Sequence, residues 1–415
     1  MPFKSDKGRN IGKILKIFNT ENLGQSLSDS QSITAGLFNA SGGIEFTIES
    51  TRYHVFASND SFVVSTASQN AESTYRILLV GGGGGGGASF GSGGGGGGLV
   101  YDQSRNVNEF GVTSIPVAIG AGGAGFAFPV SPSQGNKGAY GGVTSFGNPG
   151  EAWHHVALGG GGGSRYSTPD PYNWSLHPPT AVTTPDNTPL SIYEGMSGGS
   201  GGGAGGGPGT FVGGLGRQET YPGIPASSRF YGHGNDGGDN VTYSPSNHYS
   251  RTGGGGAGTA GGSNIVSTPE PAGGGQPGPG LNSWGWGGDG YQVPAPFMPT
   301  DNSFPAAVIS ALGGIPNASP EYRYFAGGGG GGSNGGPETS GLDSNGYNRG
   351  GLGNNSGPGG TYEYGFGNHT TTLNGGDGGN GCTGRGGGGG GGVWSTGGSG
   401  AGGGGCVIIS YPIYA

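Results

Sequence analysis

Aromatic side chains are the residues of this chain whose types and surroundings could do chemistry. They lie in long segments between runs of glycine, interspersed with Ser, Thr, Asn, Asp and Pro. Rigid amphipathic rings with small polar neighbours are typical of antibody combining loops, and flat ring faces also suit sugars. We expect some rings to contact a receptor, while more than half of them pack the segments together. The candidate receptor-binding residues are Tyr166, Tyr172, Trp174, Tyr231, His233, Tyr249, Trp284, Trp286, Tyr291, Phe297, Tyr362 and Tyr364.

Other reactive residue types form no catalytic set. Adjacent His154 and His155 would face opposite ways on a strand, so a shared metal ion is not expected. Cys382 and Cys406 match neither a redox C-x-x-C motif nor a zinc set, which leaves both free thiols and a disulfide open. Matches to G-x-G-x-x-G arise by chance among 110 glycines and lack the flanking elements of a nucleotide site. We expect no enzyme activity, no catalytic residue, no cofactor and no metal ion.

Carboxylates between the runs leave two lesser alternatives open. Two of them could hydrolyse glycosides, but that reaction needs a set separation between carboxyl groups that a sequence does not give. The stretch 234–239, Gly-Asn-Asp-Gly-Gly-Asp, is similar to calcium-binding repeats, which need consecutive copies. The carboxylates concerned are Asp170, Glu194, Glu219, Asp236, Asp239, Asp289 and Glu321.

Runs of glycine dictate the fold class. The stretch 75–101, YRILLVGGGGGGGASFGSGGGGGGLVY, holds a strand-like segment, a run, a five-residue turn, a second run and an apolar exit. One run alone should be disordered, because glycine loses more backbone entropy on ordering than any other residue. Packed side by side, extended runs can bond to their neighbours at about 0.5–1.5 kcal/mol per hydrogen bond. We expect a mostly irregular and β protein with a packed array of polyglycine-II helices.

Composition excludes several classes of protein. The 110 glycines and 28 prolines follow no Gly-X-Y period, which excludes collagen, and an aromatic content of 10% is high for a wholly disordered chain. A net charge of −8 argues against binding to nucleic acid. No apolar run approaches the ~20 residues of a membrane span, so membrane insertion is not expected.

Strand-like segments flank the glycine region. Apolar residues alternate with polar ones from residue 43 onward, and an apolar segment ends the chain. These segments are 44–48, 53–56, 61–64, 75–80 and 407–414. We expect residues 41–80 with 406–415 to form a small antiparallel sheet, in which the last segment pairs beside residues 77–80, at the base of a glycine-rich domain at residues 81–405.

Residues 1–40 differ in kind from the rest. Ile11, Ile14, Leu15 and Phe18 recur at the spacing of one helix face, and five of the sixteen basic residues lie in the first sixteen positions. This pattern is typical of a short amphipathic helix or docking peptide. Attachment to a lipid surface is a lesser alternative, because one to two turns offer little apolar area. We expect this segment to dock onto a protein partner.

The runs can be counted as alternate crossings of a bundle. Fourteen crossings place both flanking strands at one end and the long aromatic segments at the opposite end. Among the crossings, residues 198–209 are expected to descend toward the base. The long segments expected at the tip are 126–140, 164–197, 217–252, 281–326 and 361–374. At ~3.1 Å rise per residue the runs would make rods of roughly 20–30 Å.

Two motifs carry a resemblance to a known family. Ile77-Leu-Leu-Val before the first run, and Cys406-Val-Ile-Ile-Ser-Tyr after the last, resemble the opening and closing strands of glycine-rich tail-fibre and adhesin proteins of tailed bacteriophages, including marine and cyanobacterial phages. The chain is also similar to fibre-tip adhesins of T-even-like phages, whose polyglycine-II sandwich carries loops that touch the host. The resemblance covers residues 44–414, and residues 1–40 do not match the attachment region of those adhesins.

The resemblance implies a virion protein of the tail fibre or its tip. Residues 1–40 would contact other tail proteins, and the tip loops would bind a host glycan or outer-membrane protein, with a homotrimer left open. The main alternative is a structural fibre or decoration protein without a receptor. An ice-binding polyglycine protein would need short turns, and the long segments argue against it.

Overall fold

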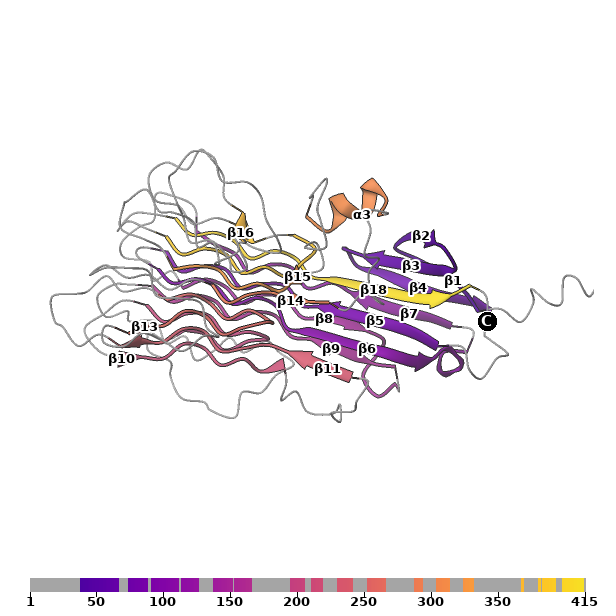
Figure 1. Ribbon diagram of the computed structural model, residues 1–415, viewed down its shortest axis with the longest axis horizontal. Coiled ribbons are helices and arrows are strands. Elements are labelled where there is room, and N and C mark those ends of the chain that lie inside the picture. Colours follow the sequence, from indigo (N-terminus) through magenta and orange to yellow (C-terminus); the bar gives the residue numbers. More distant parts are fainter. Residues whose placement is uncertain are drawn as a thin grey trace, which may run out of the picture.

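Figure 1 shows an elongated computed structural model in which strands at one end continue into extended segments. The structure describes residues 38–66, 74–88, 91–111, 113–126, 137–151, 153–165, 195–205, 210–218, 230–241, 252–265, 287–293, 304–313, 324–331, 367–368, 380–381, 383–392 and 398–413. These residues form two parts. A β-sandwich at one end is called the base, and the glycine segments form a slab whose far end is called the tip.

Two antiparallel sheets share a hydrophobic core in the base. Sheet A has the order β1-β4-β7-β8-β9, with β1 (Asn39–Ser41), β4 (Asp60–Thr66), β7 (Thr113–Ala118), β8 (Thr144–Phe146) and β9 (His155–Ala157). Sheet B has the order β11-β6-β5-β18-β3-β2, with β11 (Phe230–His233), β6 (Leu99–Asn106), β5 (Thr74–Val80), β18 (Cys406–Pro412), β3 (Thr51–Phe56) and β2 (Ile44–Ile48).

Shorter elements complete the described fold. A 3-10 turn, η2, follows β6, and one α-helix, α3, is present among the described residues. Their bounds, with those of the two- and three-stranded sheets, are η2 (Val107–Glu109), α3 (Ala306–Ala311), β10 (Thr210–Phe211), β12 (Asn240–Val241), β13 (Asn264–Ile265), β14 (Tyr291–Gln292), β15 (Tyr324–Phe325), β16 (Gly367–Asn368) and β17 (Asn380–Gly381).

The predicted class, β and irregular with antiparallel sheets, is confirmed. The last strand lies where the sequence placed it, since β18 pairs with β5 and sets Ile409 opposite Ile77 and Val407 opposite Leu79. The base is larger than expected, because β6, β7, β8, β9 and β11 come from residues within the range 81–405 that was assigned to the glycine-rich domain.

Sheet B is buried on both faces. Ile77, Leu79 and Ile409 point into the core shared with sheet A. Leu78, Val80 and Ile408 alternate with them and point into a second core, which includes Val308 and Leu312 of the α3 region. A strand buried on both faces needs a continuous apolar sequence instead of an alternating one. This explains the runs Ile-Leu-Leu-Val in β5 and Val-Ile-Ile in β18.

The register of the base continues into the slab without a slip. Val80 of β5 lies opposite Leu99 of β6. Directly beyond this pair the Gly81 N–H donates to the Gly98 carbonyl, and three residues further the Gly84 N–H donates to the Gly95 carbonyl. The strand pair of the base therefore sets the alignment of the glycine segments, termed rods, that extend from it.

The rod at residues 81–87 bonds to a different neighbour at each successive residue. The N–H groups of Gly81, Gly82 and Gly83 donate to three separate rods, and those of Gly84, Gly85 and Gly86 return to the same three in order. The neighbours that accept are 92–98, 137–143 and 398–405, and those that donate to its carbonyls are 119–126, 158–164 and 386–392. Three residues per turn is the repeat of the polyproline-II helix. The polyglycine-II conformation itself stays a prediction.

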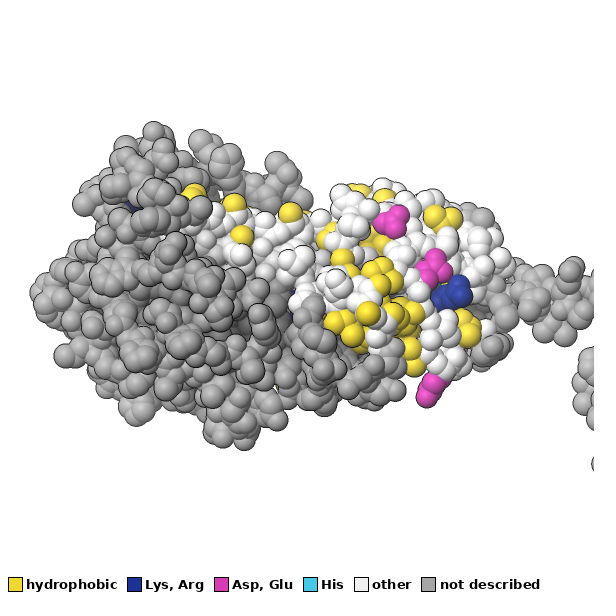
Figure 2. Space-filling view, turned by 90° about the horizontal axis from the view of Figure 1, so that it is seen from above, with side chains coloured by type: hydrophobic (Ala, Val, Ile, Leu, Met, Phe, Trp, Pro, Cys, Tyr) yellow, Lys and Arg dark blue, Asp and Glu magenta, His cyan; other side chains and the backbone are white. Residues whose placement is uncertain are grey.

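Hydrogen bonds join the layers of the slab as well as the rods within a layer. In the base, side chains separate sheet A from sheet B. Beyond the strands, the Gly82 N–H donates to the Gly142 carbonyl, which links the continuation of β5 to that of β8. In Figure 2 the described part of the slab in view is mostly white with a few separate apolar side chains, whereas a group of apolar side chains and a few charged ones lie over the base.

Two glycine runs turn back on themselves, contrary to the prediction: residues 198–209, and residues 253–262, where the Gly253 N–H donates to the Gly262 carbonyl and the Gly256 N–H donates to the Thr259 carbonyl. Residues 198–209 were expected to descend as one crossing. Instead the Gly202 N–H donates to the Met196 carbonyl across a reversal, and the N–H groups of Ser200 and Gly203 donate to Gly96 and Gly93 of an antiparallel rod. Glycine adopts turn conformations at little steric cost, so a run can hold a turn as well as a rod.

Two expected tip segments reach the base. Residues 217–252 include β11, which pairs with β6 of sheet B. Residues 281–326 include α3, whose Val308 packs against the second core of that sheet. The predicted placement of these two segments wholly at the tip is therefore wrong. The count assumed that every run crosses the bundle once.

Close packing of the rods predicts a large difference between two glycine-to-alanine changes. A Cβ on Gly84 would lie closer than 3.0 Å to the Gly161 carbonyl oxygen, whereas a Cβ on Gly404 would meet its nearest atom at 3.7 Å. We expect Gly84→Ala to cost about 3 kcal/mol or more, because rigid backbone must move. Gly404→Ala should stay within about 1 kcal/mol of the wild type. Urea unfolding measures both, and equal losses of stability would contradict the packing.

Candidate functional site

Most of the predicted binding residues lie outside the described residues. This holds for Tyr166, Tyr172, Trp174, Tyr249, Trp284, Trp286, Phe297, Tyr362 and Tyr364, and for the docking residues Ile11, Ile14, Leu15 and Phe18. The described residues that flank one of these segments, Arg165 and Gly195, both lie beside the tip end of the slab, where the Met196 N–H donates to the Gly162 carbonyl.

Three predicted receptor contacts fall at the base. Tyr231 and His233 belong to β11, which pairs with β6, and Tyr291 opens β14. The rings of His233 and Tyr291 stack with centroids 3.8 Å apart, and the hydroxyls of Tyr101 and Tyr291 are 3.1 Å apart. Their predicted position in tip loops is therefore wrong. Stacked rings that join β6, β11 and β14 serve packing, and burial lowers the pKa of His233 to about 4.

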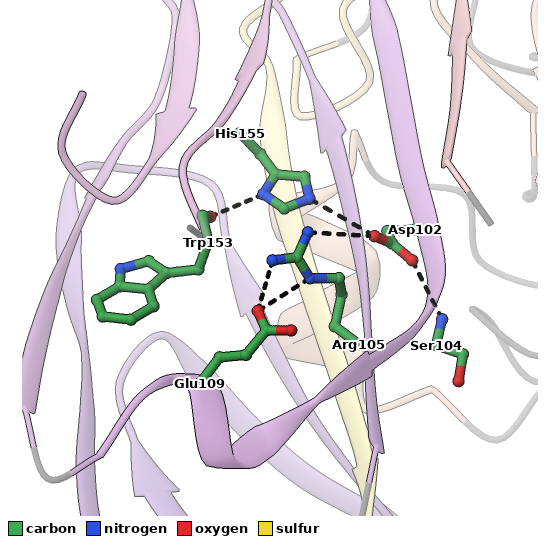
Figure 3. A network of polar contacts seen from close by, with 6 residues as sticks. All are labelled: Asp102, Ser104, Arg105, Glu109, Trp153 and His155. Carbon is green, nitrogen blue, oxygen red and sulfur yellow. Dashed lines mark hydrogen bonds and ion pairs between the residues drawn. The ribbon is translucent and has the colours of Figure 1, made fainter. Parts of the chain in front are cut away.

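A buried polar cluster connects the two sheets of the base (Figure 3). Asp102 and Arg105 come from β6, Glu109 from η2 and His155 from β9. The Arg105 guanidinium donates to Glu109 Oε2, through Nε at 3.1 Å and through Nη2, and its Nη1 lies 3.7 Å from Asp102 Oδ2. The Ser104 N–H donates to Asp102 Oδ1 at 3.2 Å. The charge of the buried Asp102 carboxylate is thus compensated by a cation and a backbone dipole.

His155 is neutral in this cluster at neutral pH. Its Nδ1–H donates to the Trp153 carbonyl at 2.7 Å, and its Nε2 lies 4.0 Å from Asp102 Oδ2. That spacing would suit an ion pair, but burial lowers the pKa of His155 to about 4. The desolvation of a ring that is 2% exposed outweighs the hydrogen bond to the Trp153 carbonyl, which by itself would raise the pKa.

The cluster is suited to holding elements together. Its carboxylates and its cation are engaged with one another, and no group of three or more His, Cys, Asp or Glu residues able to hold a metal occurs in the described part of the chain. Sequence reasoning considered His155 only beside His154. The spacing of Asp102, Arg105 and Glu109 by three and four residues was a usable signal, but their partner lies some fifty residues away in another sheet.

Two of the carboxylates considered for glycoside hydrolysis cap a rod at the margin of the slab. Asp236 Oδ1 accepts from the Gly216 N–H at 2.6 Å, and Asp239 Oδ1 accepts from the Gly213 N–H at 2.8 Å. These bonds join the rod at residues 212–217 to the neighbouring rod at residues 234–241, whose Gly237 N–H also donates to the Gly214 carbonyl. The candidates Asp170, Glu194, Glu219 and Glu321 lie outside the described residues.

The described cysteine is inert. Cys406 is a free thiol in the core of sheet B, and burial raises its pKa to about 12. A thiol that stays protonated is a poor nucleophile and metal ligand. Cys382 lies outside the described residues. Among the helices that the structure describes, none has the length and apolar character needed to cross a bilayer.

An antiparallel base that continues into a slab of hydrogen-bonded glycine rods defines a glycine-rich β protein. Residues 58–293 match the family model of the glycine-rich domain, which is more than half of the chain. The chain belongs to this glycine-rich domain family. No curated protein matches it.

The burial of His155 predicts a loss of stability in acid. Its pKa in the folded state, about 4, is below its ordinary value of 6.5, so the unfolded chain takes up the proton first as the pH falls. The stabilisation is full above pH 6.5 and is lost between pH 6.5 and 4, by roughly 3 kcal/mol. Urea unfolding at several pH values should show a shallower loss for His155→Gln than for the wild type.

The neighbouring residue supplies the control for this measurement. His154 is half-buried, and the variant His154→Gln should keep most of the acid-induced loss. Parallel pH profiles for the wild type and His155→Gln would mean that His155 is protonated in the folded state.

Proposed function

We propose that this protein is an attachment protein of a tailed bacteriophage, carried on a tail fibre or its tip, which binds a receptor on the host surface without catalysis. The proposal rests on one observation, which is that the two ends of the slab differ: one is continuous with the strands of the base, and the other is the tip. The strands of the base hold one end of the rods, and described rods end and resume at the tip, as at Arg165 and Gly195. Segments on a rigid scaffold are the usual carriers of binding.

The tip end of the slab is fastened by buried hydroxyls, which supports a display role. Ser92 Oγ and Ser164 Oγ both donate to the Gly203 carbonyl, and the single hydroxyl proton of Thr252 lies between two carbonyl oxygens, with Oγ1 2.6 Å from that of Gly238 and 3.0 Å from that of Ala204. These bonds tie together the ends of rods from which separate segments depart. Holding those ends in fixed positions lowers the entropy cost of binding.

The proposed partners follow the same division. Residues 1–40 would dock onto other tail proteins, and the tip segments would contact a glycan or an outer-membrane protein. Individual contacts to a surface glycan are weak. Several copies on one particle would raise the effective concentration and make attachment strong. The site of action would be outside the cell, on the virion.

A structural role without a receptor is the second candidate, and one observation favours it. The described rings among the predicted contacts, His233 and Tyr291, are stacked on each other inside the protein. A fibre or decoration protein would use aromatic segments in this way throughout.

Competition with phage adsorption tests receptor binding. Purified protein is incubated with host cells, phage carrying this chain are added, and free phage are counted. We expect the wild type to reduce adsorption, and a variant in which residues 166–194 are replaced by a short Gly-Ser link between Arg165 and Gly195 to restore at least tenfold more adsorption. The control is Val63→Ser, on the exposed face of the base, which should compete like the wild type. A folded wild-type protein that neither binds cells nor competes would favour the structural role.

Removal of the N-terminal segment tests docking. A chain starting at Phe38 keeps that ring in the core beside Phe62, Phe110 and Tyr411, so its unfolding midpoint should match the full chain. We expect it to bind cells but to be missing from assembled particles, as judged by mass spectrometry of purified virions. Normal incorporation would place the docking surface elsewhere.

A further inference from the structure

We propose that side chains at every third position of the outer rods close the margins of the slab, and so prevent glycine rods of a second copy of this chain from adding to it. This role is independent of receptor binding.

The central rods show what an added rod would require. Residues 81–87 are all glycine and all buried, with six neighbouring rods around them. A Cβ at any of these seven positions would lie closer than 3.0 Å to a carbonyl oxygen of a neighbour. Six rods can therefore surround residues 81–87 only because all seven positions are glycine. Nothing in a rod of pure glycine limits the number of rods, because each offers bonds in every direction.

The outer rods differ from this pattern at every third residue. In the rod that starts with β10, Val212 and Leu215 are 51% and 44% exposed, while Gly213 and Gly214 between them are buried. In the rod at residues 119–126, Ala121 and Ala124 are exposed. With three residues per turn, side chains three apart lie on one face of an extended helix. That face points away from the slab in both rods.

Side chains also occupy the backbone donors at the margin. The N–H groups of Gly213 and Gly216 are bonded to Asp239 and Asp236, which are themselves three apart and exposed. The Leu215 N–H donates to Ser197 Oγ at 3.0 Å. A rod from another molecule would find these donors taken and a Cβ in the place where its own carbonyl should sit. The device is the slab counterpart of the charged and bulged edges that keep β-sheets from joining.

The proposal makes a prediction opposite to that of a hydrophobic docking patch. If Val212 and Leu215 formed a sticky surface, their removal would lower self-association. If these side chains instead block the addition of rods, which is termed the guard role, replacing both by glycine exposes a rod face on which another rod can pack. Self-association then rises, although exposed apolar area is lost. Alanine at both positions keeps a Cβ and the guard.

The experiment is sedimentation of the full-length chain over a hundredfold range of concentration. We expect Val212→Gly/Leu215→Gly to shift to at least twice the wild-type mass as concentration rises, while Val212→Ala/Leu215→Ala keeps the wild-type mass. The same should hold at the other margin for Ala121→Gly/Ala124→Gly against Ala121→Ser/Ala124→Ser. Far-UV circular dichroism and the unfolding midpoint report whether each variant keeps the fold.

Because glycine variants are made at two separate margins of the slab, the test remains decisive if one of the variants does not fold. Larger particles for a folded glycine variant, with its Cβ-bearing control unchanged, support the guard role. Wild-type mass for the glycine variants that fold, at all concentrations, overturns it. Equal association of the glycine and alanine variants also overturns it, because the loss of a Cβ would then not be the cause.

Discussion

The absence of Cβ atoms sets the distance between neighbouring rods, and the rest of the structure depends on it. Bonds of 2.7 to 3.1 Å run from the N–H groups of Gly93 to Gly98 to three surrounding rods. Such bonds in several directions need backbones in direct contact, which any side chain would prevent. The slab is thus stabilised mainly by backbone hydrogen bonds and not by the hydrophobic effect. Each bond contributes a modest free energy, but there are many of them. Glycine pays for this in conformational entropy, so the array holds only if many rods form together.

The base supplies what glycine lacks, which is a way to specify register. A rod of identical residues can slide along its neighbour by one repeat without changing a contact. The pairs Val80 with Leu99 and Val80 with Cys406 cannot slide, because a one-residue slip would move each apolar side chain from one core of sheet B into the other, where it does not fit. The polar cluster around Asp102 and the neutral His155 fastens β6 to β9, which carry rods of different layers. Side-chain specificity in the base therefore aligns the uniform slab.

The sequence predicted the parts of the fold that depend on local pattern. The class, the strand that ends the chain and its pairing beside Ile77 follow from composition and alternation. The position of His233 and Tyr291 did not, because it depended on how often a glycine run reverses, and glycine carries no side chain to signal a turn. The partnership of Asp102 with His155 joins residues of different sheets and has no local signature. One usable signal was missed: non-glycine residues at every third position, as at Ala121 and Ala124, identify an outer rod and its exposed face.

These features bear on why such a scaffold suits the proposed display of binding segments. Among the described residues, its stability resides in backbone bonds between rods and in the two cores of the base. Segments between rods can change in length and composition while the register, set at the opposite end, is kept. The hydroxyls of Ser92, Ser164 and Thr252 then hold the rod ends whatever follows them. In such a scaffold the base sets the register of the rods, and the proposed binding segments lie at the opposite end. Their sequences can therefore change without loss of register, which favours the proposed attachment role over a purely structural one.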